Sequence, residues 1–294
     1  MHKFKLMKKY LIYIVLFVFH TNTFGQNEYK SLFWEISGNG LSEPSYLYGT
    51  MHSQDNRVFQ FKEGVLDAFN SSKTYAMELN IDSVNQLELM SKLIMDSTYS
   101  LKTLLTEEEY KLVEKFFRDS LNQPLFMFEK MQPMFTTQMV SMRDLQTQQT
   151  DALDIYFFKE AKKQKKQTIG LEKTVEQIDA FGSIPYELQA DGLVDAVKNY
   201  GKEEEMSMDS LMEYYVKGDL DKLLEMTSES DQDPEMTKIF NEVFLVNRNH
   251  NMANRAEPFI KNGSTFIAVG AAHLPGEEGV IELLRKKGYT VTAK

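Results

Sequence analysis

The sequence contains the stretch STFIAVGAAHLPG at residues 264–276, in which an apolar run ends in a Gly-x-x-His motif. Residues 264–269 are rich in β-branched and aromatic residues, and the run is short enough for one strand. Gly270 and His273 follow it directly. The pattern predicts a buried strand whose C-terminal end presents a histidine.

A second copy of this motif lies near the N-terminus, in YLYGTMH at residues 46–52. A glycine at the end of a strand permits an unusual backbone angle or a close approach, so Gly49 lets His52 turn back over the sheet edge. Beyond the first 20 residues, the only histidine outside these two copies is His250. Two copies in matching contexts indicate one paired site, and hydrogen-bonded loop histidines are the alternative interpretation.

Two glutamates occupy equivalent places. Glu78 follows a predicted strand at 74–77, and Glu172 follows another at 168–171. Ligands of open α/β sheets bind outside the carboxyl ends of the strands. If the four strands are parallel neighbours, we expect two imidazoles and two carboxylates to converge there.

The remaining pattern predicts a mixed α/β fold. A central sheet is formed by N-terminal and C-terminal strands, and large helical insertions pack around it. We expect a single domain over 26–294, with helical insertions at about 82–166 and 185–260. The predicted strands are 32–36, 46–48, 72–79, 168–171, 264–269 and 289–291.

Several helix starts carry capping signals. Thr106 and Glu109 have capping-box spacing, and Thr174 and Gln177 repeat it. Gln177 is therefore interpreted as a capping residue and left out of the site. Asp233-Pro234 predicts the start of a helix that runs to about Phe259.

The first 25 residues have the order of a secretory signal peptide, with four lysines, a run of ten apolar residues and then small and polar residues. Ten apolar residues are too few to cross a bilayer, which needs about 20, so an uncleaved anchor is the secondary interpretation. We expect an exported protein, periplasmic or secreted, with no stable membrane anchor after cleavage. The net charge of −10 disfavours nucleic acid as a partner.

Imidazole and carboxylate ligands favour Mn, Fe, Co or Zn over Ca or Mg. Such an ion acidifies a bound water and polarises a carbonyl, which is hydrolytic chemistry. The chain has no cysteine, no His-Glu-x-x-His helix and no Gly-x-Ser-x-Gly elbow. A serine triad that uses one of the two motif histidines stays open, although no serine is singled out.

Taken with their surroundings, the motifs resemble the TraB/GumN family, which is related to the Tiki metalloproteases. The resemblance covers about 30–294. It is carried by Leu32–Ile36, Tyr46–His52, Ala76–Leu79, Asp154, Gly170–Glu172, Glu176-Gln177, Arg248-Asn249, Met252-Ala253, Val269–Gly276 and Gly288-Tyr289.

The resemblance implies a metal-dependent, peptidase-like site that acts on a peptide or protein. Manganese and cobalt are the leading ions, and zinc and iron are also possible. The metal ligands it implies are His52, Glu78 and His273. The catalytic residues it implies are Glu78, Glu172 and Arg248, with Gly49, Gly270, Asp154 and Asn249 as further site candidates.

A non-catalytic function is also consistent with the same scaffold, either a protein of the cell envelope that binds metal, haem or peptide, or an interaction module. Asp154 could equally be a surface residue of its helix, and Arg248 an internal ion-pair partner. Glu176 fits a helix N-terminus. His250 lies on another helix face than Arg248 and is expected to be structural or exposed.

Overall fold

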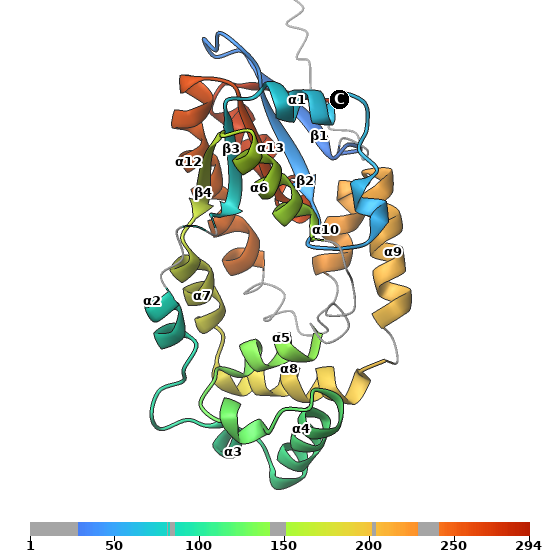
Figure 1. Ribbon diagram of the computed structural model, residues 1–294, viewed down its shortest axis with the longest axis vertical. Coiled ribbons are helices and arrows are strands. Elements are labelled where there is room, and N and C mark those ends of the chain that lie inside the picture. The colour runs from blue at the N-terminus through green and yellow to red at the C-terminus, as the bar shows by residue number, and fades with distance from the viewer. Residues whose placement is uncertain (1–28, 81, 83–85, 142–150, 202–203, 229–240) are drawn as a thin grey trace, which may run out of the picture.

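The computed structural model describes residues 29–80, 82, 86–141, 151–201, 204–228 and 241–294 (Figure 1). The predicted signal peptide at 1–25 and the predicted helix start at Asp233-Pro234 lie outside the described residues.

A six-stranded sheet in the order β4-β3-β5-β2-β1-β6 forms the centre of the fold. Strands β4, β3, β5 and β2 are parallel neighbours, whereas β1 runs antiparallel to both β2 and β6. N-terminal and C-terminal strands therefore share one sheet, as predicted. The strands are β1 (Phe33–Ser37), β2 (Ser45–Thr50), β3 (Thr74–Leu79), β4 (Gln167–Glu172), β5 (Thr265–Gly270) and β6 (Thr290–Ala293).

The burial of each strand follows its place in this order. Central β5 is buried from Thr265 to Val269, as expected of a parallel strand covered on both faces. β1 and β2 form the predicted hairpin, and its turn places Gly38, Asn39 and Gly40 at positive φ. Glycine and asparagine suit that turn because they adopt left-handed backbone angles at little cost.

Helices cover the faces of the sheet (Figure 1). Phe69 of α1 and Phe157 of α6 pack their rings against Phe266 and against each other, which places these helices over β5. In Figure 1, α12 and α13 lie behind the strands. The bounds are α1 (Val65–Ser71), α6 (Leu153–Lys163), α9 (Glu204–Lys217), α10 (Leu220–Ser228), α12 (Asn247–Asn262) and α13 (Val280–Lys286).

A second group of helices forms its own hydrophobic core around Val113, Phe117 and Leu193. It lies beyond the end of the sheet at which β3 and β4 terminate (Figure 1). The group consists of α3 (Leu101–Leu104), α4 (Glu107–Ser120), α5 (Pro133–Ser141) and α8 (Tyr186–Asn199), and α2 (Gln86–Lys92) and α7 (Thr174–Gly182) lie between it and the sheet. Both predicted insertions thus contribute helices, and the single-domain boundary stays a prediction.

Helix ends agree with the capping signals in one case and differ in another. α4 begins at the predicted capping box of Thr106 and Glu109. The helix predicted to end near Phe259 continues to Asn262 with Pro258 inside it, and a π-helical segment, Asn241–Val246, precedes it. Within the described parts of the chain, no helix is long and apolar enough to span a bilayer.

Candidate functional site

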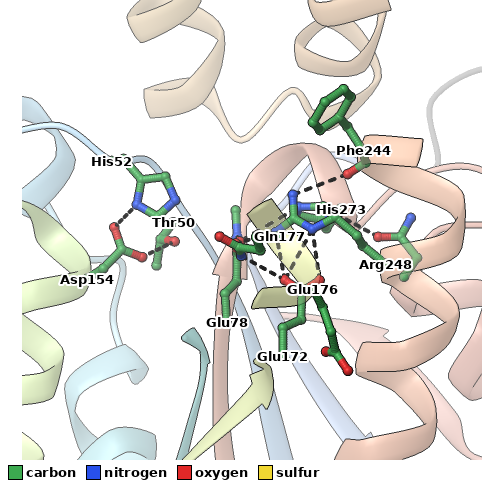
Figure 2. A network of polar contacts seen from close by, with 12 residues as sticks. Thr50, His52, Glu78, Asp154, Glu172, Glu176, Gln177, Phe244, Arg248 and His273 are labelled. Atoms are coloured by element: carbon green, nitrogen blue, oxygen red, sulfur yellow. Dashed lines mark hydrogen bonds and ion pairs between the residues drawn. The ribbon is translucent and has the colours of Figure 1, made fainter. Parts of the chain in front are cut away.

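The candidate site lies at the carboxyl ends of the four parallel strands. Thr50 at the end of β2 pairs in register with Gly270 at the end of β5, and Leu79 of β3 pairs with Glu172 of β4. This register brings the first Gly-x-x-His motif, the second motif and both glutamates to one edge, as the sequence predicted (Figure 2).

Glu78 is the central carboxylate. Its Oε1 accepts a hydrogen bond from the Gly270 backbone N–H at 2.6 Å, and its Oε2 accepts one from Arg248 Nη2 at 2.8 Å. Burial by itself raises the pKa of Glu78, but electrostatic interactions with His273, Arg248 and His52, together with the Gly270 N–H, outweigh it and lower the pKa from 4.5 to about 2. Glu78 is therefore ionised at neutral pH.

Arg248, in the first turn of α12, bridges both glutamates. Its Nε donates to Glu172 Oε1 at 2.9 Å, and its Nη2 donates to Glu172 Oε2 at 2.7 Å. A further N–H, on Nη1, donates to the Phe244 carbonyl at 3.3 Å. The Glu172 side chain is only 2% exposed, so this two-pronged pair is desolvated. One guanidinium faces two buried carboxylates, which leaves an excess negative charge that favours a second cation.

His273 is held in a defined orientation by Asn249. Asn249 Nδ2 donates to the Glu278 carbonyl at 2.8 Å, so its Oδ1 is left to face His273 Nδ1 at 2.7 Å. That contact requires a proton on Nδ1, because the amide oxygen only accepts. Burial lowers the pKa of His273 and keeps the ring neutral. The bare Nε2 then faces Glu78 Oε1 at 3.8 Å.

His52 is oriented differently, by a carboxylate. Its Nδ1 lies 2.6 Å from Asp154 Oδ2, and Thr50 Oγ1 donates to the other oxygen of Asp154 at 2.7 Å. The hydrogen bond to Asp154 is the main reason why the pKa of His52 rises to about 9. Figure 2 shows His52 and Asp154 on one side of Glu78 and Arg248 on the other. Asp154 thus contacts the motif histidine and is more than a surface residue of α6.

The two motif glycines are explained by close approach rather than by an unusual backbone angle. A Cβ atom on Gly270, whose φ is −52°, would lie 3.1 Å from Glu78 Oε1. A Cβ on Gly49 would lie 3.1 Å from the Ala271 Cα. Both distances are shorter than ordinary van der Waals contact, so a side chain at either position would push the site apart.

The structure adds one residue, Gln177, to the predicted site. Gln177 Nε2 donates to Glu172 Oε2 at 2.9 Å, so the assignment of Gln177 to helix capping alone is wrong. The start of α7 is capped by Glu176, whose carboxylate accepts from the Lys173 N–H. The sequence did contain one signal for this contact. Gln177 follows Glu172 by only five residues, and a short strand-to-helix connection can bring its side-chain amide back to the glutamate.

Three charged residues near the site form ion pairs that bear on the roles predicted for them. Glu176 also pairs with Arg255 on the surface of α12, which agrees with its assignment to the helix N-terminus. His250 forms an exposed pair with Glu278. Arg248 does form the internal salt bridge considered for it, and both partners are candidate site carboxylates.

The fit of a metal ion rests on the donor set. In the described parts of the chain, no group of three or more His, Asp or Glu forms a ready-made metal site. His273 Nε2 and Glu78 Oε1 are nevertheless two acceptors that face each other at 3.8 Å, although Oε1 also accepts from the Gly270 N–H, and a cation between them would relieve their repulsion. The nitrogen of His52 that does not contact Asp154 is a third donor of the same class. Two imidazoles and a carboxylate suit a divalent transition metal, so the residues fit such an ion.

Comparison with known proteins identifies distant relatives of the chain. The chain is 24% identical over 323 residues to metalloprotease TIKI1 of Danio rerio, covering 92% of this chain and 64% of that protein. It is 22% identical to TIKI2 of Danio rerio and 23% identical to TIKI1 of Homo sapiens, covering 61% and 62% of those proteins. The chain therefore spans less than two thirds of these relatives.

No solved structure matches the chain. The TraB/PrgY/gumN family matches residues 32–293, which include all six strands and every site residue described above. The chain belongs to the TraB/PrgY/gumN family.

Proposed function

We propose that the protein is an exported metal-dependent hydrolase that cleaves peptide bonds. The observation that carries the proposal is the pair of facing acceptors, His273 Nε2 and Glu78 Oε1, 3.8 Å apart in a buried site with an excess of negative charge. The distant similarity to metalloproteases supports the reaction class.

In this proposal His52, Glu78 and His273 hold the ion, with manganese or cobalt as the leading candidates, followed by zinc or iron. A bound divalent ion supplies an acidified water and polarises the substrate carbonyl. Because the pKa of His52 is about 9, this ring must lose a proton to become a ligand at neutral pH. Metal affinity is therefore expected to weaken as the pH falls.

The remaining residues orient these ligands. Arg248 and Gln177 occupy the oxygens of Glu172, so Glu172 acts as a buried anchor for the guanidinium rather than as a free base. Arg248 in turn fixes the Oε2 side of Glu78 and leaves Oε1 toward His273. Asn249 keeps the proton of His273 on Nδ1, away from the site.

A non-catalytic binding protein is the second candidate. The favouring observation is that both oxygens of Glu78 and both of Glu172 already accept hydrogen bonds, which leaves no carboxylate free as a general base. Such a protein would bind metal, haem or a peptide without turnover.

One experiment separates these functions. The purified protein is stripped of metal, reloaded with Mn, Co, Zn or Fe, and incubated with a mixed peptide library whose products are identified by mass spectrometry. We expect cleavage that requires metal and is lost in His52→Ala and His273→Ala. His250→Ala is the matched control, because it removes an exposed histidine outside the site. Tight metal binding without cleavage favours the second function, and absence of metal binding contradicts both metal-based proposals.

Export is a proposal that rests on the N-terminal sequence alone. Cell fractionation and N-terminal sequencing of the mature protein test it. A mature N-terminus near residue 26 in the exported fraction supports it, and full-length protein in the cytosolic fraction contradicts it.

A further inference from the structure

A pocket of about 300 Å³ lies beside the site, on the Asn249 side of His273. Asn249, which orients the His273 ring, forms part of its wall, and so does Ala272, which directly precedes His273. The proposed reaction does not use this pocket. The pocket therefore borders the candidate site through the residue before His273 and the residue that orients its ring.

The wall of the pocket is mainly apolar and is drawn from four separate segments. α10, the π-helical segment Asn241–Val246, the start of α12 and the loop after β5 all contribute. The side chains that define it are Leu224, Leu245, Val246, Ala272 and Pro275. Ligand pockets of roughly 300–1,000 Å³ are usual, so this volume suits one side chain rather than a large cofactor.

The charged residues at the rim of the pocket have partners within the protein, so they do not require an occupant of opposite charge. Glu278 is already paired with His250 and with Lys286. Lys286 also donates to the backbone carbonyl of Glu277 at 2.8 Å, so its ammonium lies at this rim. The apolar wall is therefore the main determinant of what enters.

We propose that this pocket binds an uncharged apolar side chain, such as leucine or phenylalanine, of the substrate residue next to the cleaved bond. This proposal rests on the proposed peptidase function, and it adds a preference for an apolar residue beside the cleaved bond. An occupant in the pocket would lie against Ala272, the residue before His273, and against Asn249, which holds the His273 ring.

The first test measures specificity. Peptides that differ only in the residue flanking the cleavage site, Leu, Phe, Ala or Lys, are compared by kcat/KM. We expect Leu and Phe to exceed Ala by at least about tenfold, the effect of one or more extra methylenes in an apolar pocket. Ala272→Leu, which narrows the pocket, should reduce that ratio at least about tenfold. Ala293→Leu makes the same change on exposed β6 and should leave the ratio unchanged.

The second test does not depend on activity. Metal-free, isotope-labelled protein is titrated with N-acetyl-leucinamide, N-acetyl-alaninamide or N-acetyl-lysinamide while the amide resonances of Leu245 and Ala272 are followed by NMR. We expect saturable shifts with the leucine probe, weaker shifts with alanine, and loss of the leucine shifts in Ala272→Leu. Circular dichroism confirms that the variants are folded.

The two tests separate the pocket from the reaction. Leucine-probe binding without any peptide cleavage supports the pocket and contradicts the peptidase proposal. Cleavage with no apolar preference and no effect of Ala272→Leu contradicts the pocket alone. A preference for lysine, or no shift with any probe, also overturns the pocket proposal.

Discussion

Replacement of Arg248 is expected to destabilise the fold, because this residue neutralises two buried carboxylates of the site. In Arg248→Met the side chain keeps much of its apolar length, but Glu78 and Glu172 lose their shared cation. Both carboxylates remain buried, and breaking a buried pair by deleting one partner costs about 3–5 kcal/mol of unfolding free energy. We expect a loss of that size at pH 7.

The pKa of Glu78 gives an independent magnitude and a pH window. Its decrease from 4.5 to about 2 corresponds to about 3 kcal/mol of stability. A lowered folded-state pKa contributes stability that is present above pH 4.5 and lost as the pH falls toward about 2. Since Arg248→Met removes one of the interactions that lower the pKa of Glu78, the difference in unfolding free energy between the wild type and the variant should narrow as the pH falls through this window.

Urea denaturation followed by far-ultraviolet circular dichroism, at pH 7 and at steps down to pH 3, measures both effects. Arg255→Met is the matched control. Arg255 lies seven residues further along the same helix, and its pair with Glu176 is about a third exposed, so we expect a loss of at most about 1 kcal/mol. Equal losses in the two variants, or an Arg248→Met deficit that does not change with pH, would refute the reasoning.

Three further outcomes are expected. Asp154→Asn should lower the pKa of His52 from about 9 toward 6.5, measured by NMR titration of the metal-free protein; an unchanged midpoint contradicts the hydrogen bond as the cause. In the wild type this raised pKa contributes stability that is complete below pH 6.5 and lost as the pH rises through about 9. Asn249→Leu should abolish the fixed Nδ1–H tautomer of His273 in nitrogen-15 spectra, and Asn249→Asp should retain it; identical spectra for wild type and leucine variant argue against this positioning role. Gly49→Ala should destabilise the fold by about 1–3 kcal/mol in thermal unfolding, because the added Cβ lies 3.1 Å from a backbone carbon; an unaltered midpoint means that the turn after β5 yields easily.

The site explains why two histidines in the same sequence motif differ chemically. His273 faces an amide oxygen in a buried position and stays neutral, whereas His52 faces the carboxylate of Asp154 in a position where two thirds of its side chain is exposed. The motif therefore fixes where each ring lies. Burial sets the protonation of His273, and the carboxylate of Asp154 sets that of His52.

Much of the scaffold was predictable from local pattern. The strand from 264 to 269 and its glycine ending were visible in the sequence because a buried parallel strand needs a continuous apolar run. The capping box of Thr106 and Glu109 marked the start of α4 because both groups lie within one helical turn. Gln177 shows the limit of this approach: its spacing to Thr174 satisfied a local rule, but the side chain bonds to Glu172 instead.

By itself the sequence determined the strands, their polar ends and the two repeated motifs, because these depend on neighbours a few residues apart. Only the tertiary structure decided the partners of those ends. The pairing of Arg248 with Glu78 and Glu172 joins residues 170 and 76 positions apart, and that of His52 with Asp154 spans 102. Such contacts depend on the order of strands in the sheet and on the helix that lies across it. The residues at the ends of the strands could therefore be predicted as site candidates. The protonation and tautomers of these residues, and the neighbouring apolar pocket, could be established only from the folded chain.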